Sequence, residues 1–422
     1  ARNLPADLGL WVSADYVELD YPLQLTQRIM ATYNTLWPAA IPRRAQGAVS
    51  DFDLVLNAKW HLSMVGGELE NGHFWGWEKG PDIEGLDALI DIKAGAGNVS
   101  FGGEQVKLDW LRVFRRPVEV AMDECELEVL WTGKTDWQFD LNRCRVENED
   151  IGAIGRVRMA SSEGKPEVDI NVAMERGDVS RFGDYWPQNV IKERTLRWLR
   201  TSLLSGQVSN GRYSMVGDMD DFPFSNHRGR LQALAPVTNA SIKYADGWPQ
   251  ARQVEATALF EGPGMYVEAS IGSTMGAVVD KVTARIDNFK KPVLDVTYQT
   301  ETVLPDLIGF IRQTPLLDNL DLDPDQFELT GGAGVTGHLH TGLGDSTKPL
   351  QVNGSLQLNG VRFTDLGSGI VLEDITGTLD YSRDGLEAVD LPSNYRGYPV
   401  ALDVSSDWDA EEVFRARVNG TM

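Results

Sequence analysis

The feature that most constrains the fold of this chain is a two-residue alternation of apolar and polar side chains, which recurs between turn signals. Successive side chains of a β-strand point to opposite faces, so such a run gives a strand one apolar face. Between positions 254 and 298 the runs contain Val254, Ala256, Ala258, Phe260, Met265, Val267, Ala269, Ile271, Val282, Ala284, Ile286, Leu294, Val296 and Tyr298. Small and medium side chains recur here where the core of a β-sandwich favours bulk, which fits a surface left open to a flexible ligand.

The same alternation dominates positions 47 to 183. It is punctuated by Gly66-Gly67, Asn71-Gly72, Gly102-Gly103 and Glu163-Gly164, which are dipeptides typical of turns. Closely spaced turns join antiparallel strands, because parallel strands need long crossovers. The pattern therefore predicts many short antiparallel strands.

Three stretches have helical spacing instead. Apolar residues recur at steps of three and four in the segments near 23–37, 188–204 and 305–313. We expect Gly206 to end the central helix and Pro315 to halt the last one. The central helix is expected to brace the sheet through Val190, Ile191, Trp198, Leu199 and Leu203.

No Ser-, Gly- or Pro-rich linker separates these parts. We therefore predict a mainly β fold: one continuous, elongated and curved antiparallel sheet, shaped like a groove, with a few short amphipathic helices. Within it we distinguish an N-terminal sheet segment (1–183), a central helix-plus-strand module (184–224) and a C-terminal sheet segment (225–422).

Two stretches of similar sequence suggest a repeat in the C-terminal segment. Residues 229–265 and 354–386 share the order Gly-x-Leu-Gln, aromatic, Gly, apolar alternation, aromatic, Gly-apolar. We interpret this as a divergent repeat of a strand meander. Leu356 and Leu358 of the second copy are further candidates for the apolar face.

The net charge of the chain excludes some classes of binding partner. The chain carries 62 Asp and Glu against 39 Lys and Arg, a formal net charge of -23. Phosphate contacts need a basic surface, so a nucleic-acid partner is not expected, and neither is electrostatic adhesion to anionic headgroups.

The two cysteines leave two interpretations open. Cys125 and Cys144 can bridge across the turn region at positions 131–133 if the compartment is oxidising, or they can be buried free thiols.

The chain has no run of eighteen apolar residues and starts at Ala1 without Met. We expect it to be a piece of a longer protein, with any membrane anchor outside it.

Motifs of enzymes and cofactor sites are absent. The sequence has no Gly-x-Ser-x-Gly elbow, phosphate loop, dinucleotide glycine pattern or His-Glu-x-x-His. His338 and His340 would share one face of a strand, which is metal-ligand geometry, but no third ligand is apparent nearby. We predict no catalytic residue, no cofactor and no metal.

A set of motifs resembles a known family. It comprises Tyr185-Trp186-Pro187, Leu196-x-Trp198-Leu199, Gly206-x-Val208, Gly211-x-Tyr213, Asp221-Phe222-Pro223-Phe224, Gly247-Trp248-Pro249, Phe260-Glu261-Gly262 and the segment from Phe310 to Leu316. In this order they are similar to the central region of a large member of the AsmA-like family of bacterial envelope proteins.

The resemblance implies a bridge-like lipid-transfer protein of the Gram-negative envelope. Such a protein is anchored in the inner membrane, crosses the periplasm as a curved β-sheet with an apolar groove, and conducts phospholipid acyl chains without being an enzyme. Contacts with both membranes would lie outside this chain. The alternatives are a structural or adhesive β-repeat protein with a closed, packed core, and a polysaccharide-processing enzyme on a β-scaffold.

Overall fold

A computed structural model describes residues 8–20, 24, 42–77, 80–132, 136–162, 164–186, 193–222, 224–274, 277–314, 324–343, 350–406 and 414–420. Its 21 strands belong to one antiparallel sheet. The chain divides into two compact units, the first formed by residues 1–200 and 208–233, the second by residues 201–207 and 234–422. The mainly β, antiparallel fold predicted from the alternation is confirmed.

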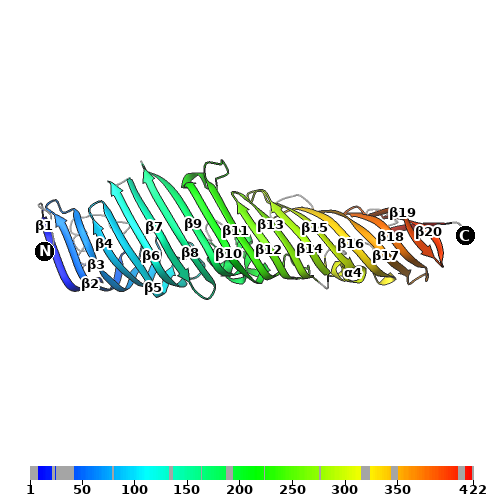
Figure 1. Ribbon diagram of the computed structural model, residues 1–422, viewed down its shortest axis with the longest axis horizontal. Helices are drawn as coiled ribbons and strands as arrows, with labels where there is room; N and C mark the ends of the chain where they lie inside the picture. The colour runs from blue at the N-terminus through cyan, green and yellow to red at the C-terminus, as the bar shows by residue number, and fades with distance from the viewer. Residues whose placement is uncertain are drawn as a thin grey trace. The chain divides into compact units, whose positions relative to one another are not determined.

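The first unit is a meander in which each strand pairs with the next (Figure 1). Its strands are β1 (Leu8–Glu18), β2 (Arg44–Asn57), β3 (Leu62–Trp75), β4 (Asp82–Lys93), β5 (Ala96–Asp109), β6 (Val118–Thr132), β7 (Asp136–Glu147), β8 (Ile151–Ser162) and β9 (Lys165–Asp178). The short helices η1 (Val179–Arg181) and α2 (Phe182–Tyr185) follow.

The second unit is also a meander. Its strands are β12 (Ala251–Glu261), β13 (Gly264–Thr274), β14 (Ala277–Ile286), β15 (Val293–Val303), β16 (Phe327–Gly342), β17 (Gln351–Asp365), β18 (Val371–Ser382), β19 (Leu386–Tyr395), β20 (Tyr398–Ser406) and β21 (Phe414–Asn419). Between β15 and β16 stand α4 (Leu304–Arg312) and η4 (Pro324–Gln326). Strands β10 (Leu203–Asp218) and β11 (Arg230–Ile242) contribute residues to both units, and η2 (Met219–Asp221) lies between them.

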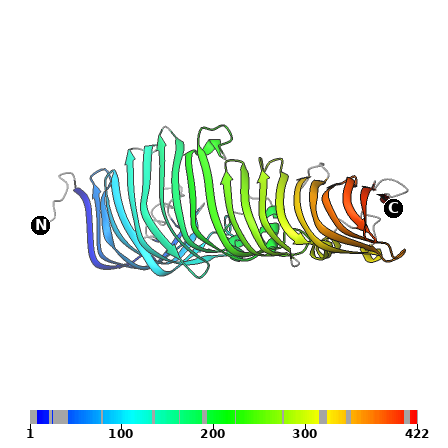
Figure 2. The same cartoon turned by 45° about the vertical axis from the view of Figure 1, so that its right-hand side comes forward.

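Most of these strands are longer than the alternating runs in the sequence. The dipeptides at 66–67, 71–72 and 102–103 lie inside β3 and β5, so the prediction that they form turns is wrong. They accompany β-bulges: the register shifts between Leu69 and Gly72, and on both sides of Gly103. An added Cβ at Gly103, where φ is 154°, would meet the Gly85 carbonyl oxygen at 2.5 Å. Bulges bend strands, and Figure 2 shows the strands of each unit curving along their length.

Helix α4 matches the predicted helix near 305–313. Pro305 occupies its first turn, where a missing backbone N–H costs nothing, and Asp306 complements the positive end of the helix dipole. Arg312 in the last turn pairs with Asp325 at 2.8 Å. Leu304 is 3% exposed, so the helix is fixed to the second unit by its first residue.

The central helix departs from its prediction. Helix α3 (Glu193–Ser202) buries Leu196 at 1% exposure, leaves Leu199 half-buried and exposes 44% of Trp198. Leu203 is the first residue of β10, and Gly206 lies within that strand, so Gly206 does not end the helix. Val190, Ile191 and most of the predicted helix near 23–37 lie outside the described residues. None of the described helices is long and apolar enough to cross a membrane.

The two cysteines form a disulfide. Cys125 on β6 and Cys144 on β7 have their Cα atoms 4.0 Å apart. Both strands shift register beside this pair. The bridge therefore ties neighbouring strands of the first unit together where their regular pairing is interrupted.

Candidate functional site

Strand register in the second unit brings the predicted apolar residues together. Directly paired residues of antiparallel strands point to the same face. Three rows run across β12, β13 and β14, and two of them continue onto β15. They are Ala256–Ala269–Val282–Tyr298, Ala258–Val267–Ala284–Val296 and Phe260–Met265–Ile286, with Val254 opposite Ile271 and Leu294 on the same face of β15.

The same face continues across β16 and β17. Val335 pairs with Thr300 of β15 and with Leu356 of β17, and Ala333 pairs with Leu358. All sixteen predicted residues therefore share one side of the sheet. We call this side of β12 to β17 the apolar face.

Most of the apolar face is only partly buried. Only Val254, Ile286 and Leu358 are buried, at 3%, 6% and 7% exposure, and the other thirteen predicted residues are half-buried. An amphipathic sheet ordinarily buries its apolar side against a second layer. Among the described residues there is no second sheet.

One part of the apolar face does carry a cover. Leu304 and Leu307 of α4 pack with Ala333 and Leu358 in a buried cluster. Phe310 of the same helix meets the Trp248 ring edge-on, with centroids 6.2 Å apart. Trp248 in turn contacts Tyr244, with centroids 5.8 Å apart. Tyr244 also packs in a second buried cluster with Val254, Ala256, Ala269 and Ile271, so the cover reaches β12 and β13 as well.

A pair of tyrosines crosses the face further along. The Tyr298 and Tyr381 hydroxyls are 2.8 Å apart, and Tyr381 donates to the Thr336 carbonyl at 3.0 Å. Tyr298, Gly337, Gly354 and Tyr381 form one cross-strand row, and a side chain at either glycine would collide with the rings. Burial raises the pKa of both tyrosines. The hydroxyls therefore remain protonated and satisfy each other, so the face keeps an apolar character there.

The first unit has a matching row of apolar side chains, which is not among the sixteen predicted residues. Ile90, Val99, Leu127, Leu141, Val157 and Ile170 pair in sequence across β4 to β9, and all six are half-buried. Their two-residue alternation was the available signal. Their larger side chains are also compatible with a packed core, unlike the small side chains at 254–298.

Two cavities of the first unit lie apart from this row. One, of about 720 Å³, is lined by Gly95, Trp131, Trp137 and other residues at the ends of β6 to β9. The other, of about 460 Å³, contains Asp150 and Asp184, both paired with Arg116 at 3.3 and 3.0 Å. Tyr185 also donates to Asp150, at 2.8 Å. Carboxylates bound in this way are typical of a structural ion-pair network.

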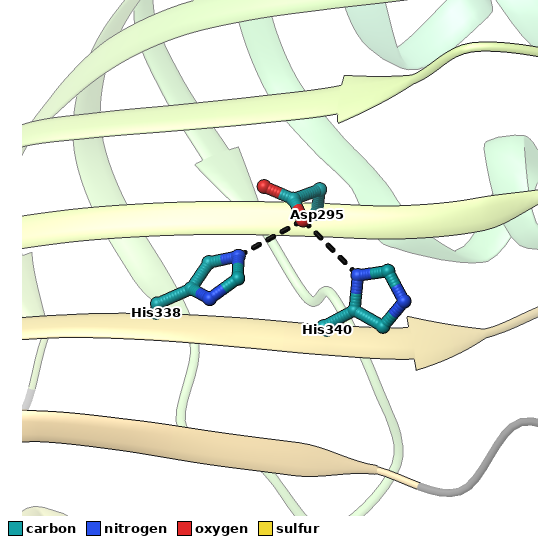
Figure 3. A group of neighbouring side chains, drawn as sticks. All are labelled: Asp295, His338 and His340. Atoms are coloured by element: carbon teal, nitrogen blue, oxygen red, sulfur yellow. Dashed lines mark hydrogen bonds and ion pairs between the residues drawn. The ribbon is translucent and has the colours of Figure 1, made fainter.

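The opposite, polar side of the second unit holds the two histidines noted in the sequence. His338 and His340 share this side of β16, as predicted from their spacing. The structure adds a third group, because Asp295 of β15 accepts hydrogen bonds from both imidazoles (Figure 3). These bonds, from His340 first and then His338, hold the pKa of Asp295 below its usual value. Asp295 lies more than forty positions away in the chain, so only strand register reveals it.

Comparison with known proteins gives one family and one relative. The family described as YhdP protein matches residues 1–422. The intermembrane phospholipid transporter YhdP of Escherichia coli (strain K12) is 21% identical over 348 residues, which is 81% of this chain. The match covers 27% of that relative, so the chain spans about a quarter of its length. No solved structure matches the chain.

Proposed function

The chain belongs to the YhdP family, and from this premise we propose that it is a segment of an intermembrane phospholipid transporter whose apolar face carries acyl chains. The observation that supports the proposal most is the combination of register and exposure. Sixteen apolar side chains share one side of the sheet, and thirteen of them stay half-exposed. A surface of this kind is stable in water at lower cost when a flexible apolar ligand lies on it.

The physical need for such a surface follows from the cost of hydrating a lipid. Each methylene exposed to water costs about 0.8 kcal/mol, so a two-chain lipid does not cross an aqueous gap unaided. A continuous apolar face removes most of that barrier while the headgroup stays in water at the edge. Six strands, β12 to β17, at about 4.8 Å spacing would give the apolar face roughly 24 Å of such a path.

The residues themselves suit transport better than tight storage. The middle of the apolar face on β12 to β14 consists of small side chains, which project little from the sheet: Ala256, Ala258, Ala269 and Ala284. No charged side chain occurs in the three rows described above. An acyl chain on this part of the apolar face would meet a uniform apolar surface, which provides no single tight binding position. We infer that lipids slide along the face, and that no catalytic step takes place.

We further propose that the segment works in the periplasm, with membrane contacts made by parts of the protein outside this chain. The Cys125–Cys144 disulfide supports an oxidising compartment. The relative is named an intermembrane transporter, which fits a location between two membranes. In this proposal the apolar face is a groove-like path between the inner and outer membranes, and the partners of the chain are phospholipid acyl chains.

The test is to isolate the chain from a Gram-negative host in a mild detergent and to examine it by native mass spectrometry. We expect mass additions that correspond to intact phospholipids and that disappear after extraction with organic solvent. A chain that is folded by circular dichroism but carries no lipid, and takes up none from labelled vesicles, contradicts the proposal. It would then favour the structural or adhesive β-repeat protein.

A further inference from the structure

The strongest unassigned feature of the described residues is the cluster of Asp295, His338 and His340 on the polar side of the second unit. Asp295 pairs directly with His340 across β15 and β16, and His338 stands two residues before it on the same side. Asp295 Oδ2 is 2.9 Å from His338 Nε2 and 3.1 Å from His340 Nδ1 (Figure 3). Three side chains from two neighbouring strands thus converge on one point.

We propose that Asp295, His338 and His340 form a binding site for Zn²⁺. One ligand atom from each residue lies within 4.8 Å of the other two. In a tetrahedral zinc site, bonds of about 2.0 to 2.1 Å place neighbouring ligand atoms roughly 3.3 Å apart. The two nitrogen-to-oxygen distances are already close to this value. Binding requires the three ligand atoms, which already lie within 4.8 Å of one another, to take up this spacing.

The types of donor select the metal. Two imidazole nitrogens and one carboxylate oxygen suit zinc and neighbouring transition metals, whereas Ca²⁺ and Mg²⁺ prefer oxygen ligands. The three side chains are 42%, 40% and 30% exposed, for Asp295, His338 and His340 respectively, so an ion can enter from solvent. A site with three protein ligands also leaves a coordination position for water.

The neighbouring strands supply a suitable surrounding. On β17, Gln351 pairs with His340 and Asn353 pairs with His338, which places two amide side chains on the same side of the sheet. The carbonyl oxygen of a side-chain amide is an acceptor, which is what the second N–H of a ligating imidazole requires. On β14, Arg285 pairs with Asp295 but donates to Asp287 at 2.5 Å. Asp287 thereby engages the nearest cation of that strand.

The bound ion would link β15 to β16 on the side of the sheet opposite the apolar face. Val296 and Leu339, which are adjacent in sequence to these ligands, pair with each other on the opposite side of the same two strands. A bound metal would hold this pair in register. We therefore assign the site a stiffening role for the apolar face, separate from lipid contact.

The experiment titrates Zn²⁺ into the chelator-treated 422-residue chain at neutral pH, in competition with a chromophoric chelator. We expect one equivalent to bind and the melting temperature to rise. His338→Ala/His340→Ala and Asp295→Asn should each weaken binding by about tenfold or more. The chain has five histidines, so His61→Ala/His73→Ala/His227→Ala is the matched control and should bind as the unmodified chain does.

A second readout guards against a folding defect. Co²⁺ in place of Zn²⁺ should give visible absorption bands with the unmodified chain and the control, and none with the double variant. Circular dichroism of the metal-free proteins should be the same for all three. No binding by the unmodified chain, or equal binding by the double variant, would overturn the proposal and leave only an aspartate–histidine hydrogen-bond network.

Discussion

Two regions of the second unit share one sequence pattern but differ in how they treat their apolar side. In β16 to β20 the alternating residues form a buried cluster that includes Leu358, Val361, Leu372 and Leu391, covered in part by α4. In β12 to β15 only Val254 and Ile286 of the fourteen predicted residues are buried. Alternation alone therefore fixes which side is apolar, but not whether that side is covered.

The difference has two visible causes. The covered region carries bulky side chains such as Leu358, Leu372 and Leu391, and Leu304 of α4 packs with them. The open region has alanines and valines at its centre and no helix that crosses it from end to end among the described elements. We infer that the covered region supplies stability and that the open region supplies the lipid surface.

The largest effect is expected from removing bulk in the covered region. Leu372 is 3% exposed within the buried cluster, so Leu372→Ala leaves a cavity as well as losing apolar contact. We expect a loss of about 3 to 5 kcal/mol in the free energy of unfolding, measured by urea denaturation. A loss below about 1 kcal/mol would show that this region is not a packed core.

Weakening the attachment of α4 should affect the covered region more than the open region. Leu304 fixes the helix to the cluster at 3% exposure. Leu304→Ala is expected to cost about 2 to 3 kcal/mol, because the end of a helix relaxes more easily than a strand. Hydrogen exchange should increase in 304–312 and not in 251–261. Equal exchange in both segments would mean that α4 does not cover the sheet independently.

A charge in the open region should separate stability from function. Val267→Asp places a carboxylate at a half-exposed position, where it stays hydrated, so the free energy of unfolding should fall by only about 1 kcal/mol. Lipid bound to the purified chain should fall severalfold.

Tyr266→Asp provides the control for that change. Tyr266 is the preceding residue on the opposite side, is 41% exposed and pairs with Arg285. It should retain the lipid content of the unmodified chain. Unfolding of the Val267→Asp variant alone would indicate a closed interior instead of an open face.

A smaller effect on stability than that of either leucine substitution is expected at the tyrosine pair. Tyr298→Phe removes one hydroxyl of the pair and should cost about 0.5 to 1.5 kcal/mol. Because burial raises the pKa of Tyr298 and Tyr381, their contribution is complete below the unfolded-state value near 10 and is lost as the pH rises above it. Stability of the unmodified chain should thus decline above that pH, and less steeply in the variant.

The sequence was sufficient to predict which residues form strands and which side of each strand is apolar. It was not sufficient to predict which strands pair and which contacts they make. Two-residue alternation identified residues such as Val267 and Val296, and strand register confirms that they share a side. Helix α4 was predictable because Pro305 and its apolar residues mark a helix directly. Whether these positions contact lipid stays a prediction.

Other features depend on contacts that a sequence does not show. Gly66 and Gly102 were interpreted as turn residues, because a glycine in a bulge and a glycine in a turn satisfy the same backbone requirement. Asp295 was missed as the partner of His338 because pairing between β15 and β16 joins distant segments. The state of Cys125 and Cys144 stayed open for a different reason, because the sequence does not give the redox compartment.

The most direct test of an open apolar face is photo-crosslinking to lipid at adjacent positions in living cells. A benzophenone amino acid is placed at Val267 or Val296, and at the neighbouring Glu268 or Thr297 on the opposite side. We predict phospholipid adducts at Val267 and Val296 and none at Glu268 and Thr297. Adducts at both sides, or at neither, in chains that fold normally would contradict a lipid path along one face.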